Sequence, residues 1–151
     1  MAGFKISETI DAPRQEVFDF ATSLDHVAEW LPNVVSVEPI TEGDLRPGYR
    51  FKETRVQGKR ESSAEIEIVE HQAPEVHAAQ AKVGKITATY TYTFHETGDG
   101  RTRVDCEADV QGAGVVKIFT GLLAMVMKKA DGNMLVSLKA AIENGGAQKA
   151  A

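Results

Sequence analysis

Residues 115–144 read VVKIFTGLLAMVMKKADGNMLVSLKAAIEN, and this stretch determines the fold that we expect. At 100° per residue, one face of a helix collects apolar and small side chains: Phe119, Leu123, Val126, Ala130, Met134, Ser137 and Ala141. The opposite face collects charged side chains: Lys117, Lys128, Asp131, Lys139 and Glu143. Because an amphipathic helix buries its apolar face, and because this one would be roughly 44 Å long, we predict that it lies across a sheet.

Small residues mark the centre of the predicted buried face. Ala130 and Ser137 belong to that face, and Gly121 and Gly132 lie nearby. Side chains of this size either let a strand approach closely or leave room between helix and sheet. We interpret them as leaving room, so the sequence predicts a cavity beneath the helix.

Before this helix, the chain alternates apolar and polar residues between short turn sequences, which is typical of strands joined by hairpins. The predicted strands are Phe4–Asp11, Val34–Ile40, Tyr49–Gln57, Glu61–Gln72, Val76–Val83, Ile86–Glu96 and Arg101–Val110. Two short helices separate the first two strands; Pro13 opens one, with Asp11 as its expected cap, and Pro32 stops the other. The expected fold is therefore α+β, with a seven-stranded antiparallel sheet.

Alternation with a period of two predicts which strand residues face the helix. On the sixth strand the inward residues include Tyr90 and Tyr92, whose hydroxyls either contact a ligand or lie in a core packed on the helix. On the third strand Phe51, Glu53 and Arg55 share the inward face. Charges on such a face are costly unless they are paired or wet, so this pair either orients a polar ligand group or forms a solvated ion pair.

The length and net charge of the chain indicate one acidic domain. With 151 residues, a net charge of −5 and a pI near 5.4, the chain is large enough for a core and poorly suited to nucleic acid. We expect a single domain over 1–144 and a flexible tail over 145–151. A lone cysteine, Cys106, and the lack of a signal-peptide pattern at the N-terminus favour a cytoplasmic location.

The longest apolar run, Ile118–Met127, is too short to cross a bilayer, although Lys128 and Lys129 behind it leave peripheral contact open. We therefore expect no stable membrane insertion. The histidines at 26, 71, 77 and 95 show no metal-ligand spacing, and no dinucleotide, P-loop or nucleophile-elbow motif occurs. The sequence predicts neither a metal nor a cofactor, and it leaves monomer and homodimer open.

Several short motifs follow one another in a particular order: Ile10-Asp11-Ala12-Pro13, Val17-Phe18, Trp30-Leu31-Pro32-Asn33-Val34, Pro47-Gly48-Tyr49 and the stretch from Leu135 to Glu143. Their order and spacing resemble the helix-grip fold of the START-like superfamily, also called SRPBCC, in its polyketide cyclase/dehydrase and lipid-transport branch. The resemblance implies a curved sheet wrapped around the long helix, with a ligand site between them. It implies no shared catalytic motif, since members include cyclases, hydrolases, carriers and receptors.

On this resemblance, the candidate ligand-binding residues surround the expected cavity. The strands and the second short helix contribute Trp30, Phe51, Glu53, Arg55, Tyr90 and Tyr92, and the long helix contributes Phe119, Leu123, Val126, Ala130 and Met134. Trp30 either guards the cavity mouth or anchors the second short helix. Glu53 is a candidate general base, and Glu8 on the first strand is expected to face the same space.

Three functional hypotheses follow. In the first, the protein binds a small lipophilic molecule, such as a polyketide-like aromatic, a fatty acid or a quinone, between sheet and helix. In the second, a cyclase or dehydratase works on the same scaffold, with Glu53 and tyrosine hydroxyls at its centre. In the third, the protein is an accessory or membrane-associated factor that acts through Ile118–Met127, as members of the superfamily that accompany carbon monoxide dehydrogenase suggest.

Overall fold

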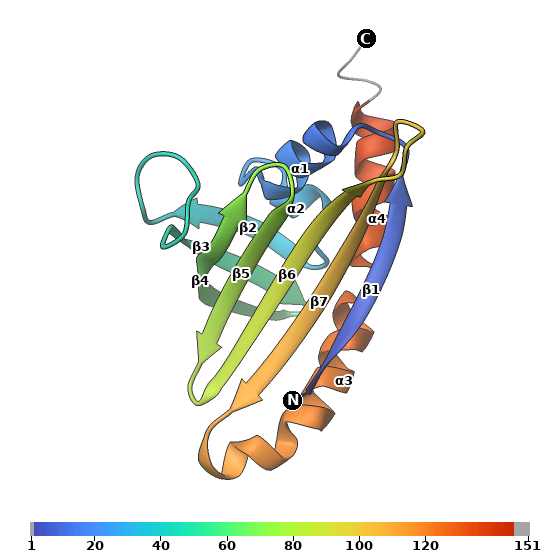
Figure 1. The fold of residues 1–151 in the computed structure, drawn as a ribbon. Helices are drawn as coiled ribbons and strands as arrows, with labels where there is room; N and C mark the ends of the chain where they lie inside the picture. Colours follow the sequence, from blue (N-terminus) through green and yellow to red (C-terminus); the bar gives the residue numbers. More distant parts are fainter. Residues whose placement is uncertain (1, 147–151) are drawn as a thin grey trace.

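A computed structural model describes residues 2–146 and arranges them as one curved sheet with helices at its ends (Figure 1). The strands are β1 (Ala2–Ile10), β2 (Val34–Pro39), β3 (Arg50–Gln57), β4 (Arg60–Gln72), β5 (Val76–Val83), β6 (Ile86–Glu96) and β7 (Thr102–Gly112). The helices are α1 (Arg14–Thr22), α2 (Val27–Trp30), α3 (Thr120–Asp131) and α4 (Met134–Ala140). A 3₁₀ segment, η1 (Gly114–Phe119), precedes α3, and a π-helical turn, η2 (Ala141–Gly146), follows α4.

The sheet has seven strands in the order β1-β7-β6-β5-β4-β3-β2, and every neighbouring pair is antiparallel. The helices α1, α2 and α4 gather at one end of the sheet, while α3 lies toward the other end beside β1 and β7 (Figure 1). This arrangement confirms the predicted α+β helix-grip fold. The remainder of the expected tail, residues 147–151, lies outside the described residues.

The long C-terminal helix is present but interrupted. Gly132 and Asn133 separate α3 from α4, and Asn133 has φ −101° and ψ 8°, outside the helical region. A Cβ atom at Gly132 would lie 2.5 Å from the carbonyl oxygen of Lys128, so only glycine lets the chain turn there without displacing the preceding turn. The break gives α3 and α4 separate environments.

The buried face of these helices differs from the predicted one. On α4 the buried residues are Met134, Leu135 and Leu138, whereas Ser137 is exposed. On α3 and the turn before it, the predicted inward residues Val126 and Phe119 are exposed, at 57 % and 58 %. The prediction was wrong in these positions because the segment is apolar on nearly every side, so hydrophobicity alone does not select a face.

Two hydrophobic clusters form the interior. The larger one joins the helical end of the sheet to β6 and β7, and its fully buried members include Phe18, Phe94, Met134, Leu135 and Leu138. The smaller one lies on the far strands β3 and β4 and consists of Tyr49, Phe51, Ile66 and Ile68. Because α4 packs only on the larger cluster, it does not fill the space beside the smaller one.

The ends of the helices also differ in detail from expectation. Pro13, not Asp11, occupies the N-cap position of α1, and no side chain caps it. The backbone N–H of Asp11 instead donates to Oε2 of Glu143 at 2.8 Å, and Lys139 Nζ donates to the Thr9 carbonyl at the same distance. These bonds fasten the last helical turns to the end of β1. Within residues 2–146, no helix has both the length and the apolar character needed to cross a membrane.

Leu138→Ala tests the role of α4 as the helix that fills the core. Leu138 is fully buried, so its truncation should lower the free energy of unfolding by about 2–5 kcal/mol. Val136→Ala on the same helix is the matched control, because Val136 is 52 % exposed and its truncation should change stability by no more than about 0.5 kcal/mol. Urea denaturation of both variants provides the measurement, and equal losses would contradict this orientation of α4.

Candidate functional site

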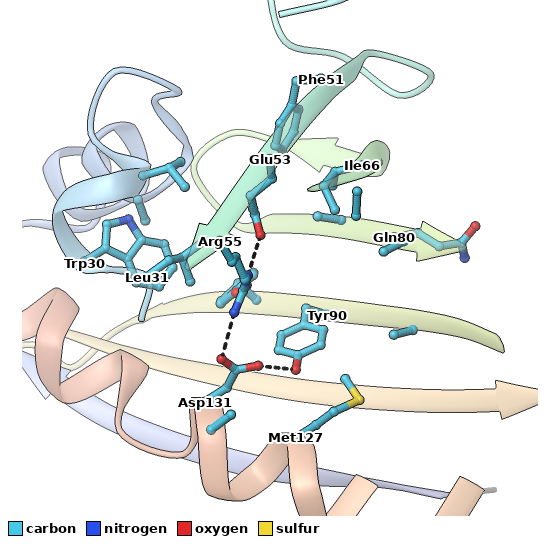
Figure 2. A pocket seen from close by; sticks show the side chains of 18 of the residues that line it. Trp30, Leu31, Phe51, Glu53, Arg55, Ile66, Gln80, Tyr90, Met127 and Asp131 are labelled. Atoms are coloured by element: carbon cyan, nitrogen blue, oxygen red, sulfur yellow. Dashed lines mark hydrogen bonds and ion pairs between the residues drawn. The ribbon is translucent and has the colours of Figure 1, made fainter. Parts of the chain in front are cut away.

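A cavity of about 350 Å³ opens between the sheet, the short helices and α3. Its wall is formed by residues from α1 and α2, by β3 to β6, and by the last turns of α3: Ala21, Thr22, Leu24, Val27, Trp30, Leu31, Phe51, Glu53, Arg55, Gln57, Ala64, Ile66, His77, Ala79, Gln80, Ala81, Ala88, Tyr90, Tyr92, Val126, Met127, Ala130 and Asp131. Most of these side chains are apolar, and four polar ones, Glu53, Arg55, Tyr90 and Asp131, are linked to one another, whereas Gln80 lies apart from them (Figure 2). Such a composition is typical of small-molecule pockets.

The space comes mainly from small residues of the sheet. Ala64, Ala79, Ala81 and Ala88 lie on three adjacent strands and face the cavity. The sequence had led us to expect the space from Ala130 and Ser137 of the helix instead. Ala130 does line the cavity, whereas Ser137 is exposed on α4 and takes no part in it.

A hydrogen-bonded cluster of four side chains spans the cavity from β3 to α3 (Figure 2). Arg55 Nε donates to Glu53 Oε1 at 2.8 Å, and Arg55 Nη1 donates to Asp131 Oδ1 at 3.2 Å. Tyr90 Oη donates to Asp131 Oδ2 at 2.6 Å. The guanidinium also reaches the Pro32 carbonyl, at 3.4 Å. Three elements distant in sequence therefore meet at one point.

Burial gives this cluster unusual electrostatics. Glu53 and Asp131 are only 8 % and 5 % exposed, so two carboxylates share one guanidinium away from bulk water. Burial alone would lower the pKa of Arg55, but the adjacent carboxylates outweigh it and raise the pKa. Burial, together with Asp131, raises the pKa of Tyr90 far above its ordinary value, so its hydroxyl stays a donor. With both carboxylates ionised, the cluster carries one negative charge.

Asp131 is the functional residue that the sequence did not reveal. We expected it on the charged outer face of a continuous helix, but it is the last residue of α3 and points into the cavity. Ala124, Met127 and Asp131 follow one another at helical spacing and form the inward side of α3. The sequence signal for this position was the helical spacing of Ala124, Met127 and Asp131, which places the carboxylate on the same side of the helix as two apolar residues.

The predicted ligand-binding residues are only partly brought together. Eight of them lie on the cavity wall: Trp30, Phe51, Glu53, Arg55, Tyr90, Tyr92, Val126 and Ala130. Phe119 and Leu123 lie outside it, and Met134 belongs to the core, where its sulfur accepts from Tyr92 Oη at 3.8 Å. Glu8, expected to face the same space, is also absent from the wall, because β1 pairs only with β7 at the opposite edge of the sheet from β3.

Trp30 lies where the cavity wall meets the core. Its ring lines the cavity and also packs edge-on against Tyr92, with ring centroids 6.0 Å apart. The residue is 4 % exposed, and its Nε1 has no hydrogen-bond partner among the described residues. A buried donor without a partner is uncommon in proteins, and because Nε1 itself has almost no accessible surface, it does not open onto the cavity.

A histidine pair lies where the cavity meets the core. His71 and His77 face each other across β4 and β5, with their Nδ1 atoms 3.0 Å apart. His77 lines the cavity and lies near Phe18 and Tyr92. Burial, with a smaller effect from His71, lowers the pKa of His77 to about 3, so the ring is neutral at pH 7.

Neither a metal centre nor a reactive thiol is apparent. No group of three or more His, Cys, Asp or Glu residues suited to a metal occurs within residues 2–146. Cys106 is buried in the sheet, and burial raises the pKa of its thiol well above the ordinary value. A protonated, buried thiol is a poor nucleophile, so the chemistry of the cavity depends on the four-residue cluster.

Comparison with protein families gives one match over nearly the whole chain. The model for polyketide cyclase / dehydrase and lipid transport proteins matches residues 1–143. Compared with curated protein sequences, the chain has no match.

Solved structures with the same fold include chains about twice as long as this one and a chain of similar length. The di-domain ARO/CYC protein BexL has a TM-score of 0.78 at 14% identity over 95% of this chain, and StfQ, from the steffimycin biosynthetic pathway, has 0.75 at 16% over 97%. The chain covers 47% of each, so it spans about half their length. A protein from Nitrosomonas europaea has a TM-score of 0.77 at 15% identity, with 97% of both chains covered. At these identities the likeness concerns the fold alone.

The histidine pair predicts how stability depends on pH. Between about pH 6.5 and about pH 3 the unfolded chain binds a proton at His77 that the folded protein excludes. The free energy of unfolding should therefore fall as the pH is lowered through this window, by up to about 1.4 kcal/mol per pH unit from this group. In His77→Phe that contribution should disappear, and denaturation curves at several pH values measure it. His95→Gln, at a half-exposed site, should keep the slope; if both variants keep it, His77 is not the cause.

Proposed function

Because the chain belongs to the polyketide cyclase / dehydrase and lipid transport family, we propose that it binds a small lipophilic molecule in the cavity between its sheet and α3. Family membership confirms the resemblance to the START-like superfamily that the sequence indicated. The fold is that of a ligand-binding scaffold, and the identity of the ligand is the part that we propose.

One observation carries the proposal: a mainly apolar cavity of about 350 Å³ contains a buried, hydrogen-bonded polar cluster. This volume lies within the usual range of small-molecule pockets, which bury most of their ligand and orient it with a few polar groups. Arg55 and Tyr90 would orient one polar group of the ligand, while Phe51 and Ile66 would contact its apolar body. Polyketide-like aromatics, fatty acids and quinones all combine one polar end with an apolar body, and the description of the family names polyketides and lipids.

The position of Glu53 favours binding over turnover. A cyclase or dehydratase on this scaffold would need a general base, and Glu53 is the carboxylate that the sequence offered. Its Oε1 accepts from Arg55 Nε at 2.8 Å, so this oxygen holds the guanidinium and only Oε2 is left to contact a ligand. Turnover of a poly-β-keto substrate that disappeared in Glu53→Gln would instead support the enzyme.

A cavity-filling substitution tests the binding proposal. Ala79→Leu places a larger apolar side chain in the cavity without adding a charge, so the variant should fold and lose its ligand. Native mass spectrometry of protein purified from its own host should show an adduct of a few hundred daltons on the wild type, released on denaturation and absent from Ala79→Leu.

Val83→Leu is the control for this experiment. Val83 lies on the same strand but is 64 % exposed and does not line the cavity, so its adduct should remain. An adduct retained by both variants would show that the ligand binds elsewhere. Wild-type protein that carries no adduct and also binds no added lipophilic molecule would contradict the proposal.

A second candidate function is attachment to an anionic membrane surface through η1 and α3. Their outer side carries a stripe of exposed apolar residues at helical spacing, each at least 57 % exposed: Val115, Ile118, Phe119, Leu122, Met125 and Val126. Val126 also lines the cavity, so the stripe extends to its opening. A helix with such an exposed apolar side can lie in the interface of a bilayer without crossing it.

Charge favours a membrane over a second copy of the chain as the occupant of this stripe. Residues 111–130 contain Lys117, Lys128 and Lys129 but no aspartate or glutamate, although the whole chain has a net charge of −5. A symmetric contact between two copies would bring these lysines near one another, whereas anionic lipids attract them. Attachment would also let a lipophilic ligand pass between cavity and bilayer without crossing water.

The double variant Leu122→Ser/Met125→Ser tests the membrane candidate. Both side chains are exposed, so the fold should persist while binding to vesicles that contain phosphatidylglycerol falls at least tenfold in co-sedimentation. Val35→Ser, at a site with 57 % exposure on β2, should bind like the wild type. Wild-type binding should weaken with added salt and on vesicles of phosphatidylcholine alone. No vesicle binding, or dimerisation abolished by the double variant, would overturn this candidate.

A further inference from the structure

The polar cluster of the cavity has a charge that restricts its ligands. We propose that it selects neutral lipophilic molecules that donate an O–H group, such as phenols, and rejects carboxylates of the same size. This inference rests on the proposed binding function and narrows its ligand class. It would remove fatty-acid anions from the candidates and favour hydroxylated aromatics.

The net charge of the cavity disfavours an anionic ligand. Among the residues that line the cavity, the acidic and basic side chains besides His77 are Glu53, Asp131 and Arg55, a formal charge of −1. His77 also lines it, but the ring is buried and neutral. The cavity therefore holds two anions and one cation before any ligand enters. A ligand carboxylate would bring a third acidic group beside two buried carboxylates, where like charges repel strongly.

The guanidinium of Arg55 has few donors left for a ligand. Two of its three nitrogens already donate, with Nε on Glu53 and Nη1 on Asp131 and the Pro32 carbonyl. Nη2 alone has no hydrogen bond to any described residue. A carboxylate usually binds arginine through two parallel hydrogen bonds, and Arg55 cannot offer that pair without giving up a bond to Glu53, Asp131 or the Pro32 carbonyl. The site thus lacks both the net charge and the donors for an anion.

The unused hydrogen-bonding atoms suit a hydroxyl group. Glu53 Oε2 accepts no hydrogen bond from the described part of the chain, and Glu53 is buried. Asp131, in contrast, is engaged at both oxygens by Arg55 and Tyr90. A ligand hydroxyl would donate to Glu53 Oε2, and the same ligand oxygen can accept from Arg55 Nη2. One hydroxyl therefore matches a vacant acceptor and a vacant donor.

A matched pair of probes tests the inference directly. Naphthol and naphthoate share one ring system and differ in carrying, at pH 7, a neutral hydroxyl or a carboxylate. Calorimetric titration of the wild-type protein should give naphthol at least tenfold tighter binding than naphthoate. Methylation of the hydroxyl should also weaken binding, because the ether has no proton to donate.

Charge-neutralising variants make the test specific to the cluster. Asp131→Asn and Glu53→Gln each remove one negative charge, so naphthoate affinity should rise at least tenfold in both. Glu53→Gln should in addition weaken naphthol binding, since an amide oxygen is a poorer acceptor than a carboxylate. Glu65→Gln removes the same charge from an exposed residue outside the cavity and should change neither affinity. Circular dichroism and denaturation curves identify any variant that fails to fold.

The outcomes separate this inference from the function on which it rests. Wild-type protein that binds naphthoate as tightly as naphthol, or more tightly, overturns the charge selection and leaves lipophile binding intact. Unchanged naphthoate affinity in both folded variants overturns the assignment of the selection to this cluster. Binding of neither probe, together with a bare chain from the native host, overturns the inference and the proposed function together.

Discussion

The contact between Arg55 and Asp131 is the interaction on which the cavity depends. It joins β3 to the end of α3 across open space, where apolar packing is sparse. Glu53, on the same face of β3, accepts a hydrogen bond from the guanidinium of Arg55. Tyr90, on β6, donates to the carboxylate of Asp131. A buried ion pair of this kind is costly unless its members are hydrogen-bonded, and here each carboxylate and the guanidinium have a partner. The cluster thus defines the width of the cavity as well as its polar side.

The break at Gly132 and Asn133 divides the C-terminal helix into parts with different tasks. The α4 side of the break fills the core with Met134, Leu135 and Leu138. The α3 side buries little, so it can form a wall without closing the space beside β3 and β4. An uninterrupted amphipathic helix would bury the same face along its whole length. The interruption is what allows a stable core and a cavity under one segment.

The helix α3 connects the cavity with the outer surface. Its inner side contributes Met127 and Asp131 to the ligand site, and its outer side carries the exposed apolar stripe of Leu122 and Met125. A helix held by few core contacts opens at lower cost than the rest of a domain. The proposed ligand selection and the proposed membrane attachment therefore meet in one element, because both depend on how α3 sits over the sheet.

Local signals in the sequence are sufficient to predict the order of the elements, the pairing of hairpins and the inward faces of the strands, since alternation and turn residues act over a few positions. They therefore placed Glu53, Arg55 and Tyr90 on inward faces. The helical spacing of Ala124, Met127 and Asp131 is a weak signal for the inward face of α3, but the pairing of Asp131 with Arg55 emerges only when the chain is folded. That helix is apolar on nearly every side, so its orientation is set by the break at Gly132 and by the pairing of Asp131 with Arg55, 76 residues away along the chain. Contacts at such separation leave no periodic trace in the sequence.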